Sequence, residues 1–136
     1  MIKRLFLFII LLVSALPIAY ANDQYAMVLF FRSDCPYCHQ FAPKFKTFTQ
    51  QKRLQTYVFS LDNQPLPEYP VPIPATPEIS QLFFEKPRNI TVPATFLINV
   101  NSRKFVRVSI GDVSYRELEQ SVNGILSDES LLEAMQ

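Results

Sequence analysis

The stretch that decides the fold is Ala26-Met27-Val28-Leu29-Phe30-Phe31, followed by Arg32-Ser33-Asp34 and then by Cys35-Pro36-Tyr37-Cys38. The apolar run predicts a buried strand. The three polar residues predict a turn that leaves Cys35 at the start of a helix. Pro36 suits the first helical position, because no backbone N–H is needed there. The sequence has only these two cysteines, so this junction is where we look for chemistry.

The pair predicts a redox dithiol. Unpaired N–H groups and the positive end of the helix dipole both stabilise a thiolate at a helix N-terminus. We therefore predict that Cys35 is the nucleophile near neutral pH, with Pro36 helping to start the helix that tunes it. Cys38 lies one turn further along and can resolve a mixed disulfide. A structural crosslink is the alternative, but so small a ring stabilises a fold little.

The N-terminus has the pattern of a secretory signal. Two positive charges in residues 1–4 precede an apolar run, and Ala19-Tyr20-Ala21 matches a signal-peptidase site. We predict a cleaved signal peptide over residues 1–21. An uncleaved membrane anchor is the weaker alternative, because the run from Leu5 to Leu16 is shorter than the ~20 residues that span a bilayer.

Residues 22–136 are expected to form a single domain. Without Lys3 and Arg4 the chain has 11 basic residues against 12 acidic ones, a net charge of −1. We expect no nucleic-acid partner, because such binding draws on clustered positive charge.

Periodicity continues the pattern past the dithiol. The spacing of four apolar side chains predicts one buried stripe of a helix: Cys38, Phe41, Phe45 and Phe48. That helix should run over Pro36–Lys52 and should be kinked by Pro43, which removes a backbone hydrogen bond. Gln55–Leu61 is rich in β-branched and aromatic residues and predicts a second strand.

Six prolines mark residues 64–77 as an insertion. They exclude a regular helix or a central strand and predict an extended backbone. We interpret the segment as a stiff surface connector, and the alternative is a lip that contacts substrate. A short helix is expected over Glu78–Glu85, with Ile79, Leu82 and Phe83 on its inner face.

The C-terminal part predicts two strands and a helix. Phe96–Val100 is the third strand. In the fourth strand two series of residues alternate, so one face is expected to be buried and the other partly exposed to solvent: Val106, Val108 and Ile110 against Phe105, Arg107 and Ser109. Ser114 and Glu117 form a capping box that opens the last helix. Residues 128–136 either extend that helix or fray.

This order of elements, with Cys-x-x-Cys at the first strand-to-helix junction, resembles the thioredoxin fold. Three matches are independent of the cysteines: Pro43, Val92-Pro93, and Gly111 with Ser114. The resemblance implies an α/β fold with a four-stranded mixed sheet flanked by helices. It also implies a cis peptide before Pro93, beside the dithiol, which would present the Val92 backbone to an extended substrate.

Three segments together resemble the TrbB family: Cys35–Phe41, Pro74–Glu78 and Thr95–Asn101. That family comprises periplasmic thioredoxin-like proteins of F-type conjugative transfer systems, associated with disulfide isomerisation during pilus assembly. The resemblance implies a periplasmic location, protein thiol or disulfide substrates, a membrane or periplasmic redox partner, and no cofactor.

Two neighbours of the cysteines have other interpretations. His39 completes the Cys-x-x-Cys-His signature of c-type haem, but that alternative gives Pro43 and Pro93 no role. Zinc is disfavoured as well, because His39 is the only further ligand near the pair. Within the thioredoxin interpretation, His39 either favours the Cys35 thiolate or faces solvent. The Tyr37 ring is expected to shape the approach of substrate.

Leu29 occupies the position where thioredoxins carry a buried carboxylate that assists the resolving cysteine. Lys44, Asp34 or a water molecule are possible substitutes. We predict an exported thiol-disulfide oxidoreductase or disulfide isomerase, and the direction of exchange depends on its redox partner. The alternative from another class is a thioredoxin-fold chaperone or assembly adaptor whose cysteines are dispensable.

Overall fold

The computed structural model describes residues 24–136, so the predicted signal peptide at 1–21 lies outside the described residues. The elements follow along the chain as β1 (Tyr25–Phe31), α1 (Pro36–Gln51), β2 (Gln55–Ser60), β3 (Ile73–Pro74), α2 (Pro77–Phe83), β4 (Ala94–Asn99), β5 (Phe105–Ile110), α3 (Tyr115–Leu126) and α4 (Glu129–Ala134). Within this part of the chain, no helix combines the length and the apolar character needed to cross a bilayer.

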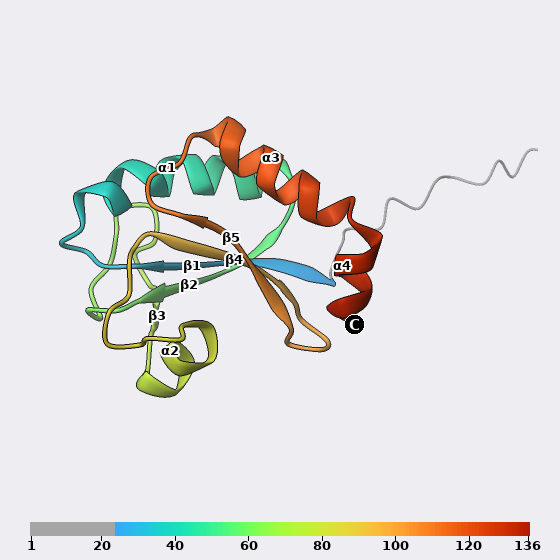
Figure 1. Cartoon of the computed structure of the whole chain (residues 1–136). Coiled ribbons are helices and arrows are strands. Elements are labelled where there is room, and N and C mark those ends of the chain that lie inside the picture. The colour runs from blue at the N-terminus through green and yellow to red at the C-terminus, as the bar shows by residue number, and fades with distance from the viewer. Residues whose placement is uncertain (1–23) are drawn as a thin grey trace, which may run out of the picture.

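The strands form one mixed sheet in the order β3-β2-β1-β4-β5. The central strand β1 pairs in parallel with β2 and antiparallel with β4, and β4 pairs antiparallel with β5. Helices α1 and α3 cover one face of the sheet, and α2 lies against the other (Figure 1). Every residue of β1 is buried, as expected for an unbroken apolar run between two covered faces.

The face under α1 and α3, here called the α1 face, is closely packed. The predicted stripe of α1 is confirmed, since Cys38, Phe41, Phe45 and Phe48 are all buried. They pack in one cluster with alternate residues of β1, namely Met27, Leu29 and Phe31, and with Leu118 and Val122 of α3. The capping box that opens α3 is also confirmed, with Ser114 and Glu117 bonded to each other's backbone N–H groups.

The opposite face, here called the α2 face, is filled by aromatic rings. Phe30 lies at their centre, with ring centroids 5.0 Å from Phe59, 5.2 Å from Phe83 and 4.9 Å from Phe84. Phe83 and Phe84 are partly exposed, because α2 has only seven residues and covers a small part of the sheet.

The sheet has five strands, so the prediction of four was wrong by one. The extra strand, Ile73–Pro74, lies inside the proline-rich segment and pairs with the end of β2. A proline is tolerated there because β3 is an edge strand whose outer side needs no N–H donor. The segment is also more than a surface connector, since Leu66 is only 2% exposed and Tyr69 packs against the α1 cluster.

Three local predictions were wrong. Leu82 is 70% exposed rather than packed beside Ile79 and Phe83. Residues 128–136 neither extend α3 nor fray, because Asp128 caps a separate helix, α4. In β5 a register shift against β4 breaks the alternation, so that Phe105 joins the aromatic cluster while Ile110 is partly exposed.

A candidate dithiol site at the start of helix α1

Cys35 is the N-cap residue of α1. Its backbone is extended, and its Sγ accepts a hydrogen bond from the Cys38 N–H at 3.2 Å. Pro36 follows at the first helical position, as predicted. A sulfur held in this way faces one of the N–H donors that a helix start leaves unpaired, and such a donor stabilises negative charge.

The two sulfurs lie in different environments. Cys35 is partly exposed, whereas Cys38 is 1% exposed and packs in the α1 cluster. Burial, together with the hydrogen bond to Cys35, raises the pKa of Cys38 to about 12. Both are free thiols in the structure. The partly exposed Cys35 can therefore reach the disulfide of another protein, whereas the buried Cys38 stays protonated and can react only with Cys35.

The segment before β4 meets the dithiol from the other side. The Val92–Pro93 peptide bond is cis, as the resemblance implied. The Cys35 thiol donates to the Val92 carbonyl oxygen, with sulfur and oxygen 3.7 Å apart. The Pro93 carbonyl in turn accepts the Gly111 N–H at 2.8 Å, and Gly111 has a φ of +89° that suits glycine. The Cys35 sulfur therefore meets the Val92–Pro93 segment, and the turn at Gly111 holds that segment from its other side.

Tyr37 and His39 lie on the outer side of the site. The Tyr37 side chain is 63% exposed, in a position to contact an approaching partner. The His39 Nε2 lies 2.6 Å from the Ser33 carbonyl oxygen, which can accept a hydrogen bond only if that nitrogen carries a proton. The structure thus directs His39 toward the turn before the dithiol, where it holds Ser33 in place.

Asp62, in the loop after β2, also holds the turn that contains Ser33. This residue was not predicted from the sequence. Its carboxylate accepts the Ser33 N–H at 2.9 Å and the Ser33 hydroxyl at 2.6 Å. It also accepts the Ser60 hydroxyl at 3.0 Å and the Gln64 N–H at 3.3 Å. Burial opposes ionisation, but these four hydrogen bonds outweigh it and lower the pKa of Asp62.

Among the described residues, neither side chain suggested as a substitute for the missing carboxylate forms a hydrogen bond with Cys38, although the charge of Asp34 contributes to the raised pKa of Cys38. Leu29 is buried beneath the site, as its place in β1 requires. Lys44 forms an ion pair with Asp112 at 2.5 Å, and Asp34 forms one with Arg32 at 3.0 Å. Within residues 24–136, no three metal-ligating side chains gather in one place.

The sequence of this chain matches a known protein family. A family model described as TraF, F plasmid transfer operon protein, matches residues 16–123. The chain belongs to this family. Protein TrbB from Escherichia coli (strain K12) is 42% identical over 78 residues, which cover 56% of this chain and 41% of that protein. The match therefore spans about two fifths of the length of that TraF-family relative.

Solved structures establish the fold of this TraF-family chain. StoA from Bacillus subtilis superposes with a TM-score of 0.54 at 19% identity, covering 73% of this chain and 82% of that one. Chloroplastic thioredoxin z superposes with a TM-score of 0.52 at 16% identity, covering 79% and 83% of the two chains. The predicted thioredoxin-like α/β fold is confirmed, with five strands instead of four.

Proposed function

We propose that this protein is an exported thiol-disulfide oxidoreductase that exchanges disulfides in cell-envelope proteins of a conjugative transfer system. The geometry of the Cys35 sulfur carries the proposal: it is partly exposed, accepts the Cys38 N–H and faces the Val92 carbonyl. Membership of the TraF family supports the biological setting. The clients would be components of the pilus or of the transfer apparatus.

The first step is attack by the Cys35 thiolate on one sulfur of a client disulfide. A new S–S bond forms between Cys35 and the client, the client S–S bond breaks, and the departing client sulfur takes up a proton. Val92 presents its backbone beside the reacting sulfur, and the Tyr37 ring borders the approach. An extended client segment can lie along the chain before Pro93.

The mixed disulfide then has two fates. In reduction, Cys38 loses its proton and attacks Cys35, so that the client leaves with two added electrons and two protons. In isomerisation, a second client thiol attacks instead, and no net electrons are transferred. Which route dominates depends on the redox potential of the dithiol and on its redox partner. A periplasmic or membrane redox partner would keep the dithiol reduced for either route.

Export rests on the predicted signal peptide over residues 1–21. Expression of the full chain in a bacterial host, followed by fractionation and mass spectrometry, tests this directly. A periplasmic product starting at residue 22 is expected. An unprocessed product that remains in the cytoplasm would contradict export.

The central experiment is titration of residues 22–136 against glutathione buffers, together with two cysteine variants. Cys38→Ala should accumulate a mixed disulfide between Cys35 and a client disulfide, and it should retain more isomerase than reductase activity on a scrambled test protein. Cys35→Ser should lose both activities and form no adduct. If partner maturation in cells survives Cys35→Ser unchanged, the protein is an assembly adaptor and the proposal fails.

A further inference from the structure

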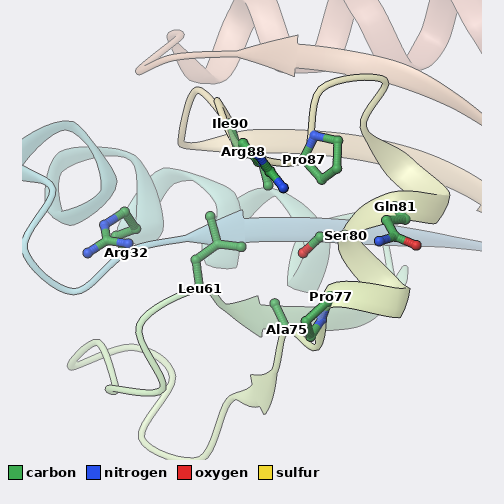
Figure 2. A pocket seen from close by; sticks show the side chains of 9 residues that line it. All are labelled: Arg32, Leu61, Ala75, Pro77, Ser80, Gln81, Pro87, Arg88 and Ile90. Carbon is green, nitrogen blue, oxygen red and sulfur yellow. The ribbon is translucent and has the colours of Figure 1, made fainter.

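A pocket of about 460 Å³ opens on the α2 side of the molecule, and Arg32, in the turn before the dithiol, is one of the residues that line it. Figure 2 shows it between two segments, with Pro87, Arg88 and Ile90 on one side and Leu61, Ala75 and Pro77 on the other. Arg32 stands at one end, toward the dithiol turn. The pocket therefore combines apolar side chains, the polar side chains of Ser80 and Gln81, and a guanidinium group on two of its borders.

Two of the residues that line the pocket, Arg32 and Ile90, lie close along the chain to groups that contact Cys35. The Arg32 carbonyl accepts the Cys35 N–H at 3.3 Å. Ile90 lies two residues before Val92, whose carbonyl oxygen is 3.7 Å from the Cys35 Sγ. Two residues of extended chain span about 7 Å. A client segment that offers its cysteine to Cys35 would therefore bring a side chain two to four residues away within reach of the pocket.

The two charged residues that line the pocket, Arg32 and Arg88, are both basic. None of the residues that line it is acidic. The Arg32 guanidinium is held by Asp34 through two hydrogen bonds, at 3.0 and 3.3 Å. Arg88 is exposed and belongs to none of the ion pairs among the described residues, and the same holds for its neighbour Lys86. Arg88 is thus the available cation of the pocket, and Lys86 adds to its positive potential.

We propose that this pocket binds an acidic side chain of the client, two to four residues from the reactive client cysteine, with Arg88 as its ion-pair partner. The inference rests on the proposed function and specifies the substrate class of the same site. Leu61, Ala75 and Ile90 would hold the aliphatic stem of a glutamate, so glutamate should be preferred over the shorter aspartate. A guanidinium can bind a carboxylate through two parallel hydrogen bonds, which adds orientation to attraction.

The test uses the Cys38→Ala protein, which stops at the mixed disulfide. Its substrates are nine-residue peptides, each with a central cysteine linked to glutathione, and one glutamate is scanned from four residues before to four residues after that cysteine in a glutamine background. The rate of adduct formation is measured by quenching and mass spectrometry. Glutamate at a position two to four residues away should raise the rate about three- to tenfold over glutamine, and high salt should reduce this ratio.

Variants assign the preference to Arg88. In Arg88→Gln the ratio of glutamate to glutamine rates should fall to about one, and in Arg88→Glu a lysine peptide should replace the glutamate peptide as the faster substrate. Arg116→Gln is the matched control, because Arg116 is an exposed arginine of α3 on the other side of the sheet. A preference that persists in Arg88→Gln, or that Arg116→Gln also removes, overturns the inference.

Failure of the inference differs visibly from failure of the proposed function. If all peptides form adducts at equal rates, the dithiol reacts but the pocket does not select acidic clients. If no peptide forms an adduct, the proposed chemistry fails, and the pocket is tested by fluorescence anisotropy with labelled peptides that carry serine in place of cysteine. Three- to tenfold tighter binding of the glutamate peptide, lost in Arg88→Gln, supports the inference, and equal affinities overturn it.

Discussion

The two faces of the sheet are covered in different ways. The α1 face holds the dithiol in place, and the α2 face has the open surface where a client can bind. On the α1 face, two long helices bury a continuous cluster that includes the sulfur of Cys38. On the α2 face, one seven-residue helix leaves the rings of Phe83 and Phe84 partly exposed. Pockets of about 460 and 580 Å³ open on that side. Close packing fixes the reacting atoms, and loose covering leaves room beside them.

The largest expected effect compares one phenylalanine from each face. Phe45→Ala should lower the free energy of unfolding by about 3–5 kcal/mol, because Phe45 is fully buried and its loss leaves a cavity. Phe83→Ala should cost only about 1–3 kcal/mol, since its ring is already partly exposed although it contacts Phe30, Phe96 and Phe105. Urea denaturation of the reduced protein measures both. Equal losses would show that the two faces are packed alike.

A second prediction concerns the carboxylate that ties the dithiol turn to the end of β2. Asp62→Asn should lower the free energy of unfolding by about 1–3 kcal/mol at pH 7, because the half-buried donors of Ser33 and the buried hydroxyl of Ser60 lose a charged acceptor. The matched change, Asp34→Asn, removes an exposed partner of Arg32 and should cost less than about 1 kcal/mol.

Acid titration sharpens this second comparison. The pKa of Asp62 is lowered in the folded protein below its ordinary value of 3.8. Its ionised form therefore stabilises the fold above that value, and this contribution is lost as the pH falls through the folded pKa. The gap between wild type and Asp62→Asn should be constant above about pH 5 and should shrink in stronger acid. A gap that widens in acid would contradict the role given to Asp62.

The third prediction uses Cys38, the part of the dithiol that belongs to the α1 face. Its pKa is raised from 9.0 to about 12 in the folded protein. Below pH 9 both states keep the proton, and between pH 9 and 12 the unfolded chain loses it first, so stability falls as the pH rises. At pH 10.5 the loss relative to pH 8 should be about 1–2 kcal/mol greater for wild type than for Cys38→Ala, both under reductant. Parallel losses in the two proteins would show that Cys38 titrates like an exposed thiol.

The sequence predicted correctly those features that depend on residues close to one another along the chain. The helix start at Cys35, the proline at position 36 and the box formed by Ser114 and Glu117 all depend on residues within one helical turn, and each was found as predicted. The cis bond before Pro93 was implied by resemblance to a family and was also found.

What the sequence did not predict depends on contacts across the fold. The bond from Ser33 to Asp62 spans 29 residues, and no periodicity points to it. The strand Ile73–Pro74 has only two residues, and its pairing depends on where β2 ends rather than on its own composition. The exposure of Leu82 likewise follows from how far α2 reaches across the sheet. An acidic residue just after a buried strand is the one local signal that pointed toward Asp62.

The smallest effect is expected at Leu82, the apolar residue that α2 turns outward. Leu82→Gln should change the free energy of unfolding by less than about 0.5 kcal/mol, because a side chain that is 70% exposed has little burial to lose. Ile79→Gln, three residues earlier on α2, should cost about 1–3 kcal/mol, since Ile79 packs against the aromatic cluster. A large loss from Leu82→Gln that grows with protein concentration would mean that a second copy covers this face in solution. The α2 face would then be a closed interface rather than an open one, and the contrast between the two faces would hold only for the isolated chain.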